Sequence, residues 1–295
     1  MADVTVQSTP STTAPSTVQQ TQVISVRLLV NASGKGVPAF NQGLYTDELP
    51  VQVPEKDAQG NPIPDEDRGT RTIQTSGCGL CAWASFLAAA GCCAPVYNAS
   101  SKTFSAGTSP IDPSSLLKYF INYLKTKPGA KIWAAYNNGV MQADSPDVRA
   151  AVNQLVALNS PGGAEFDNTV SNDLNVAPGT EVEVGVSSFL EQGNPVVLAV
   201  HSGKLGHQVL AVGIAKILDK TYYVINDSGF GLHDPFPTLQ KAGTTIDAKT
   251  LGPCLATLTR NPGKSGPWGY QNISAARVML GLQTITGLTL KPPPY

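Results

Sequence analysis

The residues best suited to chemistry in this chain are a cysteine, a histidine and an aspartate that lie far apart in the sequence. Cys78 is flanked by Gly77 and Gly79 and opens an apolar stretch that runs without a charged residue to Gly91. A thiol at the start of a helix ionises more easily, because the helix dipole and free backbone N–H groups stabilise the thiolate. The sequence therefore predicts a nucleophilic cysteine at position 78.

A nucleophilic thiol needs a base, and the base needs an acceptor that fixes its tautomer. Of the three histidines, His207 begins an apolar strand, whereas we expect His201 and His233 to lie in loops. Asp227 follows the next strand, and neighbouring antiparallel strands bring such positions within side-chain reach. We therefore predict that His207 is the general base and that Asp227 orients it, with Asn226 on the opposite face.

Two further residues near Cys78 are candidates. Cys81, one turn along the helix, is the second candidate nucleophile, although burial is expected there and the dipole is less effective. Gln74 could donate its side-chain amide to an oxyanion, alongside the Cys78 backbone N–H, or be a plain loop residue. Cys78-x-x-Cys81 would also suit half a zinc site or a redox pair, but no second Cys-x-x-Cys or His pair follows. We expect no metal and no cofactor.

The composition indicates a folded protein and argues against two classes of partner. The chain has 295 residues and is 41% hydrophobic, which is enough for a substantial core. Charged residues make up 14% and the net charge is −1, so there is no basic surface for nucleic acid or an anionic membrane. The five cysteines are an odd number with four close together, which favours free thiols and synthesis in a reducing compartment.

The two ends of the chain differ in composition from the middle. Residues 1–22 are rich in Ser, Thr, Gln and Pro and lack the pattern of a secretory signal, so we expect a disordered leader and cytoplasmic synthesis. Export by a non-classical route and association with a virion remain open. We expect a single domain over 23–290, with an insertion at about 95–180, and a proline tail over 291–295. The uncharged run 72–101 is interrupted by Pro95, which favours a buried helix over a membrane span.

The elements that must position the candidate residues follow from apolar periodicity and helix caps. Besides the helix that starts at Cys78, we predict helices at 114–125, 147–158, 186–192 and 274–282. We predict strands at 22–30, 131–136, 195–200, 208–214 and 222–225, and an exposed acidic loop at 54–69. Helices followed by a run of strands are typical of an α+β protein.

A family resemblance rests on four blocks of sequence. The block from Cys78-Gly79-Leu80-Cys81 to Gly91 resembles the cysteine motif of the bacteriocin-processing (double-glycine leader) cysteine peptidases. Three later blocks are similar to that family's Gly-x-Pro-Val, Gly-His-Tyr-Val-Val-Val-x-Gly and Tyr-Val-x-Asn-Asp-Pro motifs, in the same order: Gly193-Asn194-Pro195-Val196, Gly206-His207-Gln208-Val209-Leu210 and Tyr223-Val224-Ile225-Asn226-Asp227. Gly77, Gln74 and Ser228 depart from the family pattern.

The resemblance implies a papain-like fold, in which a central N-terminal helix packs on an antiparallel sheet. It implies that Cys78 is the nucleophile, His207 the base, Asp227 the orienting carboxylate and Gln74 the oxyanion donor. The expected activity is that of a cysteine peptidase acting on peptide or isopeptide bonds of a peptide or protein substrate. Two alternatives stay open: a peptidoglycan-cleaving amidase or endopeptidase, and an inactive papain-like interaction protein. The sequence predicts no oligomeric state.

Overall fold

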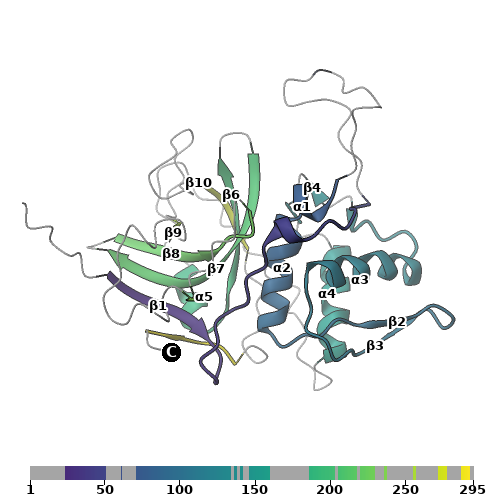
Figure 1. Cartoon of the computed structure of the whole chain (residues 1–295), viewed down its shortest axis with the longest axis horizontal. Coiled ribbons are helices and arrows are strands. Elements are labelled where there is room, and N and C mark those ends of the chain that lie inside the picture. The colour runs from purple at the N-terminus through teal and green to yellow at the C-terminus, as the bar shows by residue number, and fades with distance from the viewer. Residues whose placement is uncertain are drawn as a thin grey trace, which may run out of the picture.

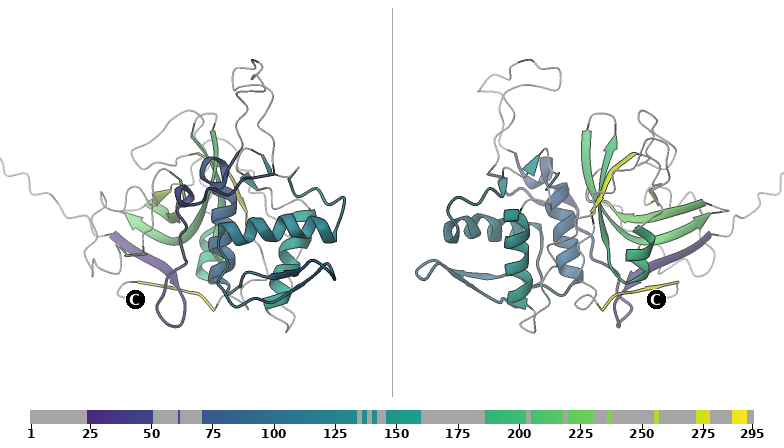
Figure 2. Two further views of the ribbon diagram at one scale, coloured as in Figure 1. Left: turned by 45° about the vertical axis from the view of Figure 1, so that its right-hand side comes forward. Right: turned by 180° about the vertical axis from the view of Figure 1, so that it is seen from behind.

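The protein has a sheet lobe and a helical lobe that meet at one central helix. The computed structural model describes residues 24–50, 61, 71–133, 136–137, 140–141, 146–159, 186–202, 205–217, 220–229, 236–237, 255–256, 272–277 and 287–292. Helix α2 (Cys78–Ala89) lies between the sheet and the helices α3 and α4 (Figure 1). The same arrangement is visible from two further sides (Figure 2). This is a mixed, α+β architecture with antiparallel sheets.

The remaining elements fall into three groups. The other helical segments are η1 (Gln42–Leu44), α1 (Ile73–Ser76), α3 (Pro113–Thr126), α4 (Pro146–Asn159) and α5 (Val186–Glu191). The main sheet holds β1 (Ile24–Val30), β6 (Val196–Ser202), β7 (Leu205–Ile217), β8 (Lys220–Asn226), β9 (Leu255–Ala256), β10 (Asn272–Arg277) and β11 (Thr289–Lys291). Two small hairpins pair β2 (Val96–Asn98) with β3 (Thr103–Ser105), and β4 (Tyr136–Asn137) with β5 (Val140–Met141).

Strand β7 is the axis of the main sheet. Its first part pairs with β6 and its second part with β1, while β8 pairs with β7 from Leu210 onward. The register with β8 shifts between Ala211 and Gly213. A Cβ at Gly213 would come within 2.4 Å of the Arg27 carbonyl oxygen, so only glycine lets β1 approach here. Strands from both ends of the sequence thus join the same sheet, since β11 pairs with β1.

Helix α2 is buried on every side along most of its length. Its residues from Cys78 to Leu87 are all buried, and Trp83 and Phe86 pack edge to face at 5.8 Å between ring centroids. A helix that is apolar all round is stable only inside a core. The predicted buried helix is confirmed, and its packing against β7 fixes the position of its first turn relative to the strand that carries His207.

The helical lobe begins with well-capped α3. Asp112 caps it, because its side chain accepts from the Ser115 N–H at 2.7 Å while the Ser115 hydroxyl accepts from the Asp112 N–H, and Pro113 occupies the first turn. Tyr119 on α3 donates to the Ala151 carbonyl of α4 at 2.6 Å. The helices predicted at 114–125, 147–158 and 186–192 are confirmed as α3, α4 and α5.

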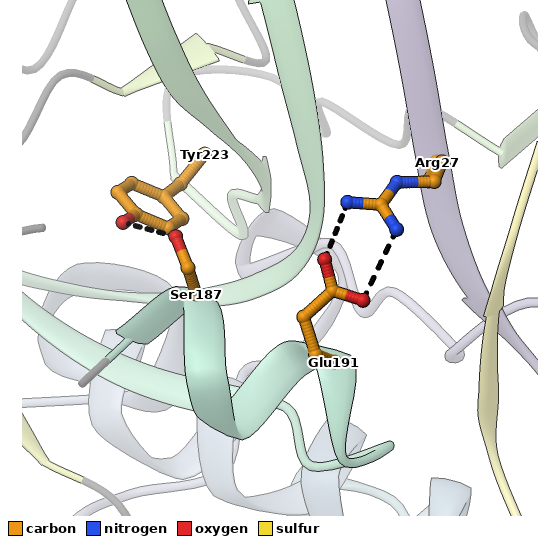
Figure 3. Close-up of polar contacts among 4 residues, drawn as sticks. All are labelled: Arg27, Ser187, Glu191 and Tyr223. Atoms are coloured by element: carbon orange, nitrogen blue, oxygen red, sulfur yellow. Dashed lines mark hydrogen bonds and ion pairs between the residues drawn. The ribbon is translucent and has the colours of Figure 1, made fainter. Parts of the chain in front are cut away.

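The short helix α5 is tied to the sheet by two polar contacts (Figure 3). Glu191 forms a bidentate ion pair with Arg27 on β1, with distances of 3.0 and 2.5 Å. Ser187 shares a hydrogen bond of 2.9 Å with the Tyr223 hydroxyl on β8. The ion pair is half-exposed, so it contributes at most about 1 kcal/mol. These contacts fix the position of α5 relative to β1 and β8, two of the strands that pair with β7.

Three sequence-based expectations need correction. The helix predicted at 274–282 is wrong over its first residues, because 272–277 form strand β10 paired with β6; sheet pairing overrides the helical preference of the alanines there. His201 lies in β6 rather than in a loop. Of the strand predicted at 131–136, residues 131–133 are not in a strand and Tyr136 begins β4, while residues 134–135 lie outside the described residues.

Several other expectations concern the ends of the chain and its loops. Strands predicted at 22–30, 195–200, 208–214 and 222–225 are confirmed as β1, β6, β7 and β8 with small changes of bounds. Lys291, the first residue of the predicted tail, pairs with Leu28 at the end of β11. The leader at 1–22, His233 and nearly all of the loop at 54–69 lie outside the described residues.

Candidate functional site

Cys78 is held at the first position of α2 by two short preceding segments. Helix α1 has a capping box in which the Thr72 hydroxyl accepts from the Thr75 N–H and the Thr75 hydroxyl accepts from the Thr72 N–H. Gly77 then separates α1 from α2, whose first intrahelical bond runs from the Cys81 N–H to the Gly77 carbonyl at 2.9 Å. Cys78 is 5% exposed. Its thiol therefore sits at the positive end of an α-helix dipole, largely shielded from water.

His207 and Asp227 meet where β7 extends beyond the end of β8. The last β7–β8 pair joins Leu210 to Asn226, so Asp227 continues along β7 toward His207. The His207 Nε2 and the Asp227 Oδ1 are 2.6 Å apart. Asp227 is 1% exposed and the His207 side chain 13%. The sequence-based expectation that neighbouring strands bring these two residues together is matched by this contact.

The imidazole of His207 is linked to Cys78 as well as to Asp227. Burial acts to lower the pKa of His207, but hydrogen bonds to Asp227 and Cys78, with the negative charges of both, raise it to about 10. Because Nε2 faces Asp227, Nδ1 is the ring nitrogen that remains for the thiol. A protonated imidazole at neutral pH therefore stands beside a thiol at the start of a helix, which is the pairing of acid–base group and nucleophile that catalysis by a cysteine requires.

Cys81 lies one turn deeper and is chemically different. It is 1% exposed, and its pKa is raised to about 12 by burial and by the charge of Cys78, against a lowering hydrogen bond to Ser228. Cys81 also lines a cavity of about 10 Å³ between α2 and the sheet, with room for no more than about one water molecule. Of the two cysteines, Cys78 is the one that contacts the histidine, whereas Cys81 stays a neutral core thiol at pH 7.

Asn226 and Gln42 hold the backbone on either side of Asp227, the first through its side chain and the second through its backbone N–H. The Asn226 side chain donates to the carbonyls of Val37 and Pro38 at 3.2 and 3.3 Å. The Gln42 backbone N–H donates to the Ser228 carbonyl at 2.9 Å. The Gln42 side chain donates to the Gln74 carbonyl at 2.9 Å. Gln42 thus joins the segment after Asp227 to the segment before Cys78.

Gln74 is exposed at the surface near Cys78. Its side-chain amide donates to the Gly43 carbonyl at 3.3 Å, and its backbone N–H donates to the Tyr45 carbonyl at 2.8 Å. One amide hydrogen is therefore directed toward η1. Its assignment as an oxyanion donor stays a prediction.

Sequence reasoning named Cys78, His207 and Asp227, which the structure brings together, but it missed two residues that contact the segments around them. Gln42 stands in no recognisable motif, and only the folded chain places it between the two halves of the site. Gly229 donates its backbone N–H to Asp227 Oδ1 at 2.9 Å. The tripeptide Asp227-Ser228-Gly229 carries a weak turn signal that could have drawn attention to it.

No metal site emerges from the part of the chain that the structure describes. Within those residues there is no group of three or more His, Cys, Asp and Glu side chains arranged to hold a metal ion. Within the same residues, no helix is both long and apolar enough to cross a membrane. None of the four described cysteines, Cys78, Cys81, Cys92 and Cys93, is in a disulfide bond.

Comparison with known proteins gave no relative from which a function could be transferred. No protein-family model, no curated protein and no solved structure matches this chain.

Proposed function

We propose that the protein is a cysteine peptidase with a papain-like fold, which hydrolyses peptide or isopeptide bonds. The observation that carries this proposal is the hydrogen-bonded chain from Cys78 through His207 to Asp227, with the cysteine at the start of a buried helix. The fold supports it, because α2 packs on the long strand of an antiparallel sheet and the base and its carboxylate come from neighbouring strands.

The reaction follows from the positions of the three side chains. The Cys78 thiolate attacks the carbonyl carbon, forming a C–S bond and a tetrahedral oxyanion, which N–H groups at the start of α2 stabilise. The His207 imidazolium gives its proton to the leaving amine as the C–N bond breaks, leaving a thioester on Cys78. His207 then takes a proton from water, whose oxygen attacks the thioester. Loss of the thiolate releases the carboxylic acid and restores the starting ion pair.

The first test is chemical and requires no knowledge of the substrate. We expect iodoacetamide at pH 7 to alkylate Cys78 faster than Cys93, by at least about tenfold, because a thiolate rather than a thiol is the nucleophile. Peptide mass mapping of a time course measures both rates in one sample. Cys93 is a suitable internal comparison, since it is half-buried and more exposed than Cys78. Equal rates at the two positions would contradict the proposal.

The second test identifies the reaction. A library of internally quenched peptides should be cleaved by the wild-type protein and by Cys81→Ala, whereas Cys78→Ala should fold normally and have no activity. Activity retained in Cys78→Ala but lost in Cys81→Ala would move the nucleophile to position 81. Cleavage of purified peptidoglycan with no cleavage of peptides or proteins would favour the peptidoglycan hydrolase. An alkylated but inactive protein, on both substrate classes, would favour a binding scaffold.

A further inference from the structure

Gly229 contacts both partners of the His207–Asp227 ion pair. Its backbone N–H donates to Asp227 Oδ1 at 2.9 Å. The same oxygen lies 2.6 Å from His207 Nε2. One carboxylate oxygen thus accepts two hydrogen bonds, and the bond from Gly229 limits rotation of the carboxylate about its side-chain torsion. The orientation of the imidazole depends on that oxygen.

The missing side chain of Gly229 matters for a steric reason. A Cβ built at this position would lie 3.0 Å from Cε1 and 3.3 Å from Nε2 of His207, and 3.5 Å from Asp227 Oδ1. Gly229 is not among the glycines with a positive φ angle, so the backbone conformation does not demand glycine here. Glycine is favoured here because the space beside the His207 ring is too small for a methyl group without a shift of the ring. The ring is hydrogen-bonded to Asp227 and to Cys78, so it cannot move away without lengthening one of these bonds.

We propose that Gly229 is a positioning residue for the reaction, which fixes the Asp227 carboxylate and leaves room for the His207 ring at its contact with Cys78. This inference rests on the proposed function, because it gives Gly229 a role in preparing the thiolate–imidazolium pair. The effect of Gly229 reaches the reaction through the geometry of His207.

The test compares Gly229→Ala with the wild-type protein in an NMR titration of the His207 ring. We expect a lower pKa of His207 in the variant, because the added methyl group displaces the ring from Asp227 and Cys78. Peptide hydrolysis should lose about tenfold or more in kcat with little change in KM, since a displacement of about 1 Å can cost about a hundredfold. Ser228→Ala, which removes atoms from the same turn and adds none beside the ring, should change neither quantity.

The titration separates the two proposals. An unchanged pKa of His207 in Gly229→Ala overturns the role of Gly229, whether or not the protein is an enzyme. A wild-type protein without hydrolytic activity overturns the proposed function, and the titration still decides about Gly229. If Gly229→Ala does not fold, the double variant His207→Ala/Gly229→Ala should fold, because the ring that clashes is gone. A double variant that also fails to fold would refute the steric argument.

Discussion

Replacing Asp227 by asparagine tests the ion pair with almost no change of shape. Asp227 is 1% exposed, and its Oδ1 accepts from His207 and from the Gly229 N–H. An asparagine oxygen can accept both bonds, but the negative charge is lost. A hydrogen bond to a charged group contributes about 1.5–3 kcal/mol and a neutral one about 1 kcal/mol, so each bond weakens by about 0.5–2 kcal/mol.

The weaker bond to His207 has a calculable effect on the thiol. A loss of about 0.5–2 kcal/mol corresponds to an about two- to thirtyfold smaller population of the thiolate–imidazolium pair. We expect the alkylation rate of Cys78 to fall by that factor on the acidic side of its pH profile, where the rate is proportional to this population. The weakening of both bonds in Asp227→Asn should lower the free energy of unfolding by about 1–4 kcal/mol, which urea denaturation measures.

Glu191→Gln is the matched control for loss of a carboxylate. Glu191 also forms a short ion pair, but with Arg27, and its side chain is 48% exposed. Its loss should cost at most about 1 kcal/mol and leave the alkylation of Cys78 unchanged. The reasoning is refuted if Asp227→Asn and the wild-type protein have the same alkylation profile, or if Glu191→Gln slows alkylation as much.

Two further predictions concern pH and stability. Because the pKa of His207 is raised to about 10, His207 is protonated at neutral pH, and kcat/KM should fall as the pH rises through about 10. In Asp227→Asn this fall should begin at a lower pH. If kcat/KM falls at the same pH in both proteins, His207 is not the group whose titration limits the activity. Asp112→Ala removes the cap of α3 and should lower the free energy of unfolding by about 1 kcal/mol without changing the alkylation rate of Cys78, which denaturation and mass mapping of the same sample will show.

Local sequence patterns predicted the elements whose signals are local. Asp112 and Pro113 mark the start of α3 by capping and backbone geometry, which act within one turn. The uncharged run after Cys78 predicted a buried helix, because no face of it could be exposed to water. Strands β7 and β8 were visible as apolar runs, and their closeness in sequence made the His207–Asp227 contact a reasonable expectation.

The missing parts of the prediction depend on long-range contacts. The pairing of β1 with β7 and β11 joins segments that are distant in the sequence. The residues Ile24–Val30 alone do not predict which strands they pair with. Strand β10 contains alanines that favour a helix in isolation, yet it forms a strand because its backbone pairs with β6. Gln42 and Gly229 matter only through contacts that exist after folding.

The order of the site residues along the chain has a consequence during synthesis. Asp227 follows Cys78 by 149 residues, which takes about 7–30 s at about 5–20 residues per second. Throughout that interval Cys78 has been made, while the strands that bring His207 and Asp227 to it are still missing. If the proposed function holds, a growing chain cannot use Cys78 as a nucleophile, because the base and its carboxylate reach the cysteine only after the sheet has formed.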